Sequence, residues 1–242
     1  MKRLIIPLLL TIFLVSCEEI EDLLPNGLTE AEVVQGLKSA LTVGTDTAVF
    51  QTSRLDGFYK DAIIKILMPP DARVIVENIS YVPGGEAMLD EMILLVNRAA
   101  EDAAASATPV LKDAILSMTI TDAYNILQGS DSAATHYLRT KTFLPLKQAF
   151  MPIVTTSLNK ELLPGLSPNE AWAELTGAYN TVANSLVGQL AGLTPVNAQL
   201  DGYVTHKALS GLFLKIADEE KAIRTDPFAR VNEILKKVFG KG

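Results

Sequence analysis

The chain has 242 residues, of which 48% are hydrophobic and 20% are charged, and its formal net charge is -7. This composition is typical of a globular protein with its own hydrophobic core, and it excludes an intrinsically disordered chain. The acidic balance and the lack of any basic run argue against nucleic acid as a partner, because binding a phosphate backbone requires clustered Lys and Arg.

Residues 1–16 have the pattern of an export signal. Lys2 and Arg3 precede an apolar run at 4–15, which is too short to cross a bilayer as a helix. The run leads into Leu-Val-Ser-Cys, which resembles a bacterial lipobox. We therefore expect Cys17 to become the lipidated first residue of the mature protein, carrying several acyl chains such as palmitate. The alternative is an ordinary cleaved signal followed by an incidental cysteine.

Cys17 is the only cysteine of the chain. If it carries the lipid, the protein has no disulfide, no cysteine nucleophile and no thiolate metal site. Residues 17–28 then form an acidic tether, and removal of the signal leaves 19 basic against 28 acidic residues, a net charge of -9. No aspartate follows Cys17 directly, so the inner-membrane retention signal of enteric bacteria is not matched. We expect attachment to the bacterial outer membrane, with the periplasmic and the surface-exposed side both open.

The rest of the chain predicts helices one after another. Thr29 and Glu32 have the spacing of a capping box, so a helix is expected from there to Arg54, with a bend at Gly44. Residues 58–67 leave two alternatives open, a very short β element or a buried turn of helix, because periodicity does not distinguish short apolar runs. Further helices are expected over 71–81, 86–107, 109–118, 121–129 with Thr121 or Asp122 as the cap, 131–160 with bends at Pro145 and Pro152, 167–188, 201–226 and 227–240. The predicted fold is all-α, a single multi-helix domain of orthogonal or bundle-like type over residues 29–242.

The helix expected at 201–226 has one apolar stripe, made of Leu209, Leu212, Phe213, Ile216 and Ile223. Thr205 and Glu220 fall inside this stripe, and Arg224 lies at its edge, one turn after Glu220. A carboxylate that faces the core must find a partner. We therefore interpret Glu220 as ion-paired with Arg224 or with a basic residue of another helix. The alternative is a carboxylate that lines a pocket.

The common catalytic and cofactor motifs are missing. His136 and His206 lie in different predicted helices without the spacing of a metal site, and neither a glycine-rich phosphate loop nor Gly-x-Ser-x-Gly occurs. The acidic run at 218–220 is typical of a solvated helix face. We therefore predict no catalytic residue, no metal ion and no cofactor.

Arg98, Arg139, Glu220 and Arg224 are the candidates for a specific role. Arg98 lies opposite the core stripe of the helix expected at 86–107. If the four side chains converge, they form either a structural network that fixes helix register or a pocket for an anion or a small ligand.

Four stretches together resemble the bacterial domain of unknown function 4197 family: DGFYKDAIIKILMPP at 56–70, LLVNRAAEDAA at 94–104, AATHYLRTKT at 133–142, and 203–240. The resemblance covers about residues 30–240. It implies an exported, mostly helical protein, often a lipoprotein, and it implies no catalytic residue.

Two hypotheses about function follow. The first is a membrane-anchored envelope lipoprotein whose helical body is a non-catalytic module that binds a protein or a small apolar or anionic ligand. The alternative is an envelope enzyme that uses a cleft built from Glu220 with Arg98 or Arg139.

Overall fold

The computed structural model describes residues 29–230 together with Glu233, Lys236 and Val238. The predicted signal and tether at 1–28, with Cys17, lie outside this part, as do half of the residues of the helix expected at 227–240. The described residues form nine α-helices and three short 3₁₀ turns, and they contain no β-strand. The predicted all-α fold is confirmed.

The α-helices in chain order are α1 (Glu30–Ser53), α2 (Arg73–Glu77), α3 (Gly85–Ala104), α4 (Ala107–Leu116), α5 (Ile120–Leu127), α6 (Ala133–Leu158), α7 (Pro168–Ala183), α8 (Leu186–Leu190) and α9 (Asp201–Thr225). The 3₁₀ turns are Pro70–Ala72, Ile79–Tyr81 and Pro227–Ala229.

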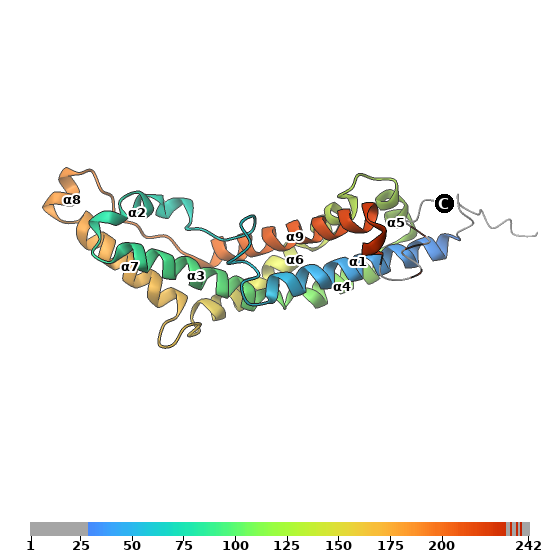
Figure 1. Ribbon diagram of the computed structural model, residues 1–242, viewed down its shortest axis with the longest axis horizontal. Coiled ribbons are helices and arrows are strands. Elements are labelled where there is room, and N and C mark those ends of the chain that lie inside the picture. Colours follow the sequence, from blue (N-terminus) through green and yellow to red (C-terminus); the bar gives the residue numbers. More distant parts are fainter. Residues whose placement is uncertain (1–28, 231–232, 234–235, 237, 239–242) are drawn as a thin grey trace, which may run out of the picture.

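The helices form an elongated body (Figure 1). In one half of it, α9 packs against both α1 and α6, and α4 and α5 pack against the same two helices. In the other half, α3 packs against α7, and the short helices α2 and α8 lie near the end. Because α3 also contacts α1, α6 and α9, it joins the two halves. The first residues of α1 lie at one end of the body, and α8 lies at the opposite end.

The central position of α3 follows from its small side chains. Ala99, Ala100, Ala103 and Ala104 are all buried. Alanine side chains take up little space, so the backbones of neighbouring helices can approach closely while the interior stays densely packed. The second half of α3 therefore contacts several helices at once.

The helix starts show where local sequence signals hold and where one does not. Thr29 and Ser167 begin α1 and α7 as predicted, each forming a capping box with the glutamate three residues later. The cap expected for α5 is wrong. Thr119, not Thr121 or Asp122, is the N-cap, because its hydroxyl oxygen accepts the N–H of Asp122, whose carboxylate in turn accepts the N–H of Thr119.

Two further expectations are wrong. The helix α1 continues through Gly44 without a break, because a single glycine costs a helix only about 1 kcal/mol relative to alanine and need not end it. This glycine lies against α9, where a Cβ would meet the Cβ of Glu219 at an ordinary contact distance of 3.5 Å. Residues 58–67 form neither a strand nor an α-helix but turns followed by an extended segment. Asn97 of α3 holds that segment, since its side chain bonds both the N–H and the C=O of Ile66 at 2.8 Å each.

The helix α6 is the longest of the described part, with 26 residues, and it continues through Pro145 and Pro152. Each proline removes one backbone N–H and so leaves a carbonyl without its helical partner. Both prolines are exposed, so water can satisfy those carbonyls and the helix need not end there. Neither α6 nor any other described helix is both long and apolar enough to cross a membrane.

Candidate functional site

Glu220 lies at the centre of a buried polar site. Its side chain is on α9, and the residue is only 7% exposed. The Oε1 atom accepts the N–H of Ala134 at 2.9 Å, and Oε2 accepts both the N–H and the hydroxyl of Thr135 at 2.7 Å each. These amides belong to the first turn of α6, whose own N-cap Ser132 makes no side-chain cap. A carboxylate from α9 therefore caps α6, at the end where the helix dipole favours negative charge.

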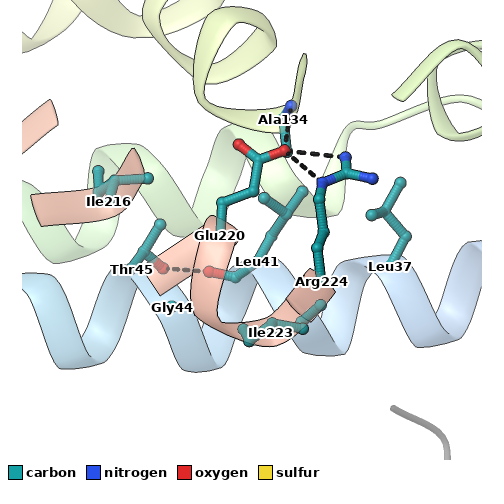
Figure 2. Close-up of a pocket in the computed structure, with 10 residues that line it drawn as sticks. Leu37, Leu41, Gly44, Thr45, Ala134, Ile216, Glu220, Ile223 and Arg224 are labelled. Atoms are coloured by element: carbon teal, nitrogen blue, oxygen red, sulfur yellow. Dashed lines mark hydrogen bonds and ion pairs between the residues drawn. The ribbon is translucent and has the colours of Figure 1, made fainter. Parts of the chain in front are cut away.

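Arg224 neutralises this buried carboxylate from one turn further along α9. It donates to Oε1 of Glu220 from Nε at 3.0 Å and from Nη2 at 2.8 Å (Figure 2). The Nη2 group also donates to the carbonyl of Ile126 in α5 at 3.0 Å. The expected ion pair is thus confirmed, and it ties α5, α6 and α9 together. Glu220 accepts five hydrogen bonds in total, which saturates the roughly four lone-pair positions of a carboxylate.

A small cavity lies beside Glu220, between α1 and α9 (Figure 2). Its lining includes Leu41, Gly44, Ile216 and Ile223. The volume is about 20 Å³, which is room for about one water molecule. The Glu220 carboxylate therefore borders a space too small for a substrate or a ligand.

Arg98 belongs to a second polar network. Its Nη1 donates to Oε2 of Glu101 and its Nη2 to Oδ1 of Asp56, both at 2.6 Å. Glu101 is 4% exposed, and its Oε1 accepts the N–H of Phe58 at 3.0 Å and that of Tyr59 at 3.1 Å. This network fixes the chain just after α1 onto α3.

The turn at Asp56 and Gly57 has a special backbone. Asp56 adopts a left-handed φ of 66°, a conformation that aspartate tolerates better than most residues. A Cβ on Gly57 would lie 2.3 Å from the carbonyl oxygen of Gln51. Glycine is therefore required for the chain to reverse directly at the end of α1.

An open groove of about 380 Å³ lies beside this turn. Its charged lining residues are Arg54, Asp56, Lys60, Asp61 and Lys215. Lys60 pairs with Asp56 at 2.7 Å, and its hydrogen bond is the main cause of a lowered pKa of Asp56. Burial acts to raise the pKa of Asp61, but the bonded Lys215 ammonium helps to outweigh it and the pKa is lowered. Because an anion in this groove would face two carboxylates as well as the cations, the groove has no clear charge preference.

Arg139 lies apart from both networks. Its guanidinium is exposed and sits 5.6 Å from the ring centre of Phe143 and 5.5 Å from that of Phe213, which is a cation–π geometry. In the described part of the chain, neither Arg98 nor Arg139 shares a hydrogen bond or ion pair with Glu220 or Arg224. Of the four predicted site residues, the structure brings together only Glu220 and Arg224.

The two histidines are both exposed. His206 packs edge-on against Phe143, with the ring centres 6.1 Å apart. His136 lines an open groove of about 590 Å³ between α5 and α6, together with Asp122 and Tyr137. Burial first, and the nearby Asp122 second, raise the pKa of Tyr137, so its phenol stays protonated at neutral pH. Across residues 29–230, no three His, Cys, Asp or Glu side chains gather as a metal site would require.

The roles of Asn97 and Asp56 were not predicted from the sequence. Asn97 is completely buried and follows Ile93 by one turn, on the apolar side of α3. A polar residue on an apolar stripe is a signal of a buried hydrogen-bond partner. No comparable signal connects Asp56 to Arg98, because the two are 42 positions apart.

Comparison with known proteins supports the resemblance seen in the sequence. A family model described as "Protein of unknown function (DUF4197)" matches residues 27–240, which includes every described helix. A search of the curated proteins and a search of the solved structures each found no match.

Proposed function

The chain belongs to the DUF4197 family of proteins, and we propose that it is a membrane-anchored lipoprotein of the bacterial envelope whose helical body is a non-catalytic binding module. In this proposal Cys17 carries the lipid, residues 17–28 are the tether, and the outer membrane is the location. The support for the anchor is the charged start, the short apolar run and the small residue before the only cysteine.

The observation that carries the non-catalytic part of the proposal is that the two glutamates buried in the described part of the chain are fully used inside the protein. Glu220 accepts five hydrogen bonds and Glu101 accepts three. In each case the donors are backbone amides of another segment and one arginine, with one hydroxyl besides at Glu220. A general acid or base must reach the proton of a bound substrate, and the cavity beside Glu220 has room for about one water molecule.

The alternative function, an envelope enzyme, gains no support from the positions of its proposed residues. Arg98, Arg139 and Glu220 have separate sets of partners. The cavity beside Glu220 and the groove beside Asp56 contain neither of these two arginines. A cleft that combines them is therefore not formed.

The anchor is tested in a bacterium with an outer membrane, by feeding an alkynyl palmitate analogue to cells that express the full chain. The wild type is expected to carry the label and to fractionate with the outer membrane. Cys17→Ser is expected to lose the label, whereas Ser16→Ala, which keeps a small residue before the cysteine, is expected to retain it. Equal labelling of Cys17→Ser and wild type would contradict the anchor.

The binding role is tested by crosslinking in intact cells, followed by purification of the chain and mass spectrometry of what is attached. The control is a fusion that carries residues 1–28 of this chain on an unrelated soluble domain. A partner or ligand is expected to be recovered with the full chain and not with the fusion. If both give the same set of attached molecules, the helical body contributes no binding and the proposal fails.

A further inference from the structure

The helix α8 lies at the end of the body away from the start of α1 (Figure 1) and carries three exposed aliphatic side chains. Leu186, Val187 and Leu190 are 75%, 68% and 81% exposed. We call these three side chains the α8 tip. Single exposed aliphatic residues are common on protein surfaces, but three in one five-residue helix call for an explanation.

The α8 tip stands on a firmly bonded backbone. The Oγ atom of Ser185 accepts the N–H of Gly188 at 3.1 Å, and the N–H groups of Gln189 and Ala191 are bonded to carbonyls at 2.9 Å. Gly188 is packed so closely beneath α7 that a Cβ there would lie 2.1 Å from the carbonyl oxygen of Val182. The close packing of Gly188 against α7 therefore holds the tip outward, and the N–H groups of Gly188, Gln189 and Ala191 already have acceptors within the protein.

The chain around the α8 tip carries no charge. From residue 175 to residue 200 there is no Asp, Glu, Lys, Arg or His, although the whole chain has a net charge of -7. The polar residues beside the tip are Ser, Asn, Gln and Thr. The tip therefore has no ionic group to strip of water, and no charge that an anionic surface would repel.

A second copy of the chain is an unsuitable occupant of the α8 tip. A second copy of the tip would cover only a few side chains, far below the roughly 800 Å² per partner of a standard stable interface.

A lipid bilayer fits the tip better than a protein pocket does. The residues that dominate protein interfaces are Trp, Tyr and Arg, whereas Leu, Val, Ser and Thr are under-represented there. Residues 184–194 contain none of the first group and six of the second. Aliphatic side chains gain free energy in any hydrocarbon and need no shaped partner. We propose that the α8 tip inserts into the outer layer of a lipid bilayer, as a second membrane contact at the end of the body opposite to the start of α1.

This inference rests on the proposed envelope location, which brings a bilayer within reach of the body. The test uses the full lipidated chain with Val187→Cys, labelled with an environment-sensitive fluorophore and reconstituted into phosphatidylcholine vesicles. An acylated Cys17 has no free thiol, so the label is confined to position 187. Its emission is expected to shift to the blue and to be quenched by lipids that carry a nitroxide on the acyl chain.

The matched control places the same label at Ile63→Cys. Ile63 is also 75% exposed but lies on the connection between α1 and α2, so its label is expected to keep an aqueous emission. In the chain labelled at 187, Leu190→Ser is expected to lower the ratio of inserted to free tip at least about tenfold, because burial of a leucine contributes at least that factor. Since the tip is uncharged, neither salt nor anionic lipid should change the shift.

The outcomes separate the two proposals. An aqueous emission at position 187, with the palmitate label on Cys17 intact, would overturn the insertion of the tip and leave the anchor standing. Reaction of the fluorophore with Cys17 of the wild type would contradict the anchor. The fluorophore at position 187 would then be measured in a chain that also carries Cys17→Ser, and quenching by the labelled lipids would still support insertion of the tip.

Discussion

Replacement of Glu220 by Gln is expected to destabilise the protein rather than to remove a reactive group. If the new amide nitrogen takes the place of Oε2, it faces the N–H of Thr135. If it takes the place of Oε1, it faces the N–H of Ala134 and two donors of Arg224. The first arrangement is less costly, but it still leaves one buried donor without an acceptor and one buried arginine without its counter-charge. Breaking a buried ion pair costs about 3–5 kcal/mol, so we expect a loss of about 3–4 kcal/mol in the free energy of unfolding. For a domain of this size, the melting temperature should fall by roughly 6–16 °C.

Urea unfolding followed by far-ultraviolet circular dichroism measures this loss. The control is Glu219→Gln, which removes the same charge one residue earlier, where the partly exposed carboxylate accepts one hydrogen bond from Gln51 at 2.8 Å. It is expected to cost less than about 1 kcal/mol. Arg224→Met, alone and combined with Glu220→Gln, completes a double-mutant cycle with an expected coupling above about 1.5 kcal/mol. A Glu220→Gln chain as stable as the wild type would refute the structural role of this carboxylate.

Three further predictions concern stability and use the same urea assay. Gly44→Ala is expected to raise the free energy of unfolding by about 1–1.5 kcal/mol, because alanine favours the helix and its methyl group would meet Glu219 and Ile223 at ordinary distances of 3.5 and 3.8 Å. The control is Gly177→Ala, on the exposed face of α7, where the new methyl group has no atom nearby. It measures the part of the stabilisation that comes from helix propensity alone. Asn97→Leu is expected to cost about 2–4 kcal/mol, because the buried N–H and C=O of Ile66 both lose their partner, and an unchanged midpoint would contradict that role. Asp61→Asn is expected to destabilise the protein at pH 7, and less so as the pH falls below about 3.9. The folded-state pKa of Asp61 is lowered, so its pairing stabilises the fold fully above the unfolded-state pKa of about 3.9, and this stabilisation is lost as the pH falls through the folded-state value. A difference between wild type and Asp61→Asn that stays constant from pH 7 to pH 3 would count against this linkage.

The parts of the fold that could be predicted are those that depend on neighbours in the sequence. The capping boxes at Thr29 and Ser167 involve residues three positions apart, and they place the starts of α1 and α7 correctly. The apolar stripe of α9 also places Glu220 on the buried side, as observed. Such signals depend on helix geometry alone, so a sequence is sufficient to find them.

The partners of the site residues could not be predicted, because they lie far away in the chain. Glu220 bonds to amides that are 86 and 85 positions earlier, and Arg98 bonds to a carboxylate 42 positions earlier. A helical wheel shows which side chain faces the core, but not which backbone group it meets there. A bend was also expected at Gly44, but a single glycine need not end a helix, and α1 is continuous at that residue.

The two buried glutamates follow one physical rule. Each accepts two backbone N–H groups from a distant segment, and each is paired with an arginine on its own helix, Arg98 three residues before Glu101 and Arg224 four residues after Glu220. The amides replace the water that a buried carboxylate loses, and the arginine balances its charge within one turn, so no further element is needed to make burial tolerable. Both pairs are therefore complete as they stand. Contacts with a membrane or a partner should then depend on the exposed side chains. Glu220→Gln is therefore expected to lower the stability of the protein without changing the lipid quenching at position 187 below the unfolding temperature. Leu190→Ser should do the opposite: it should reduce that quenching and leave the unfolding midpoint unchanged.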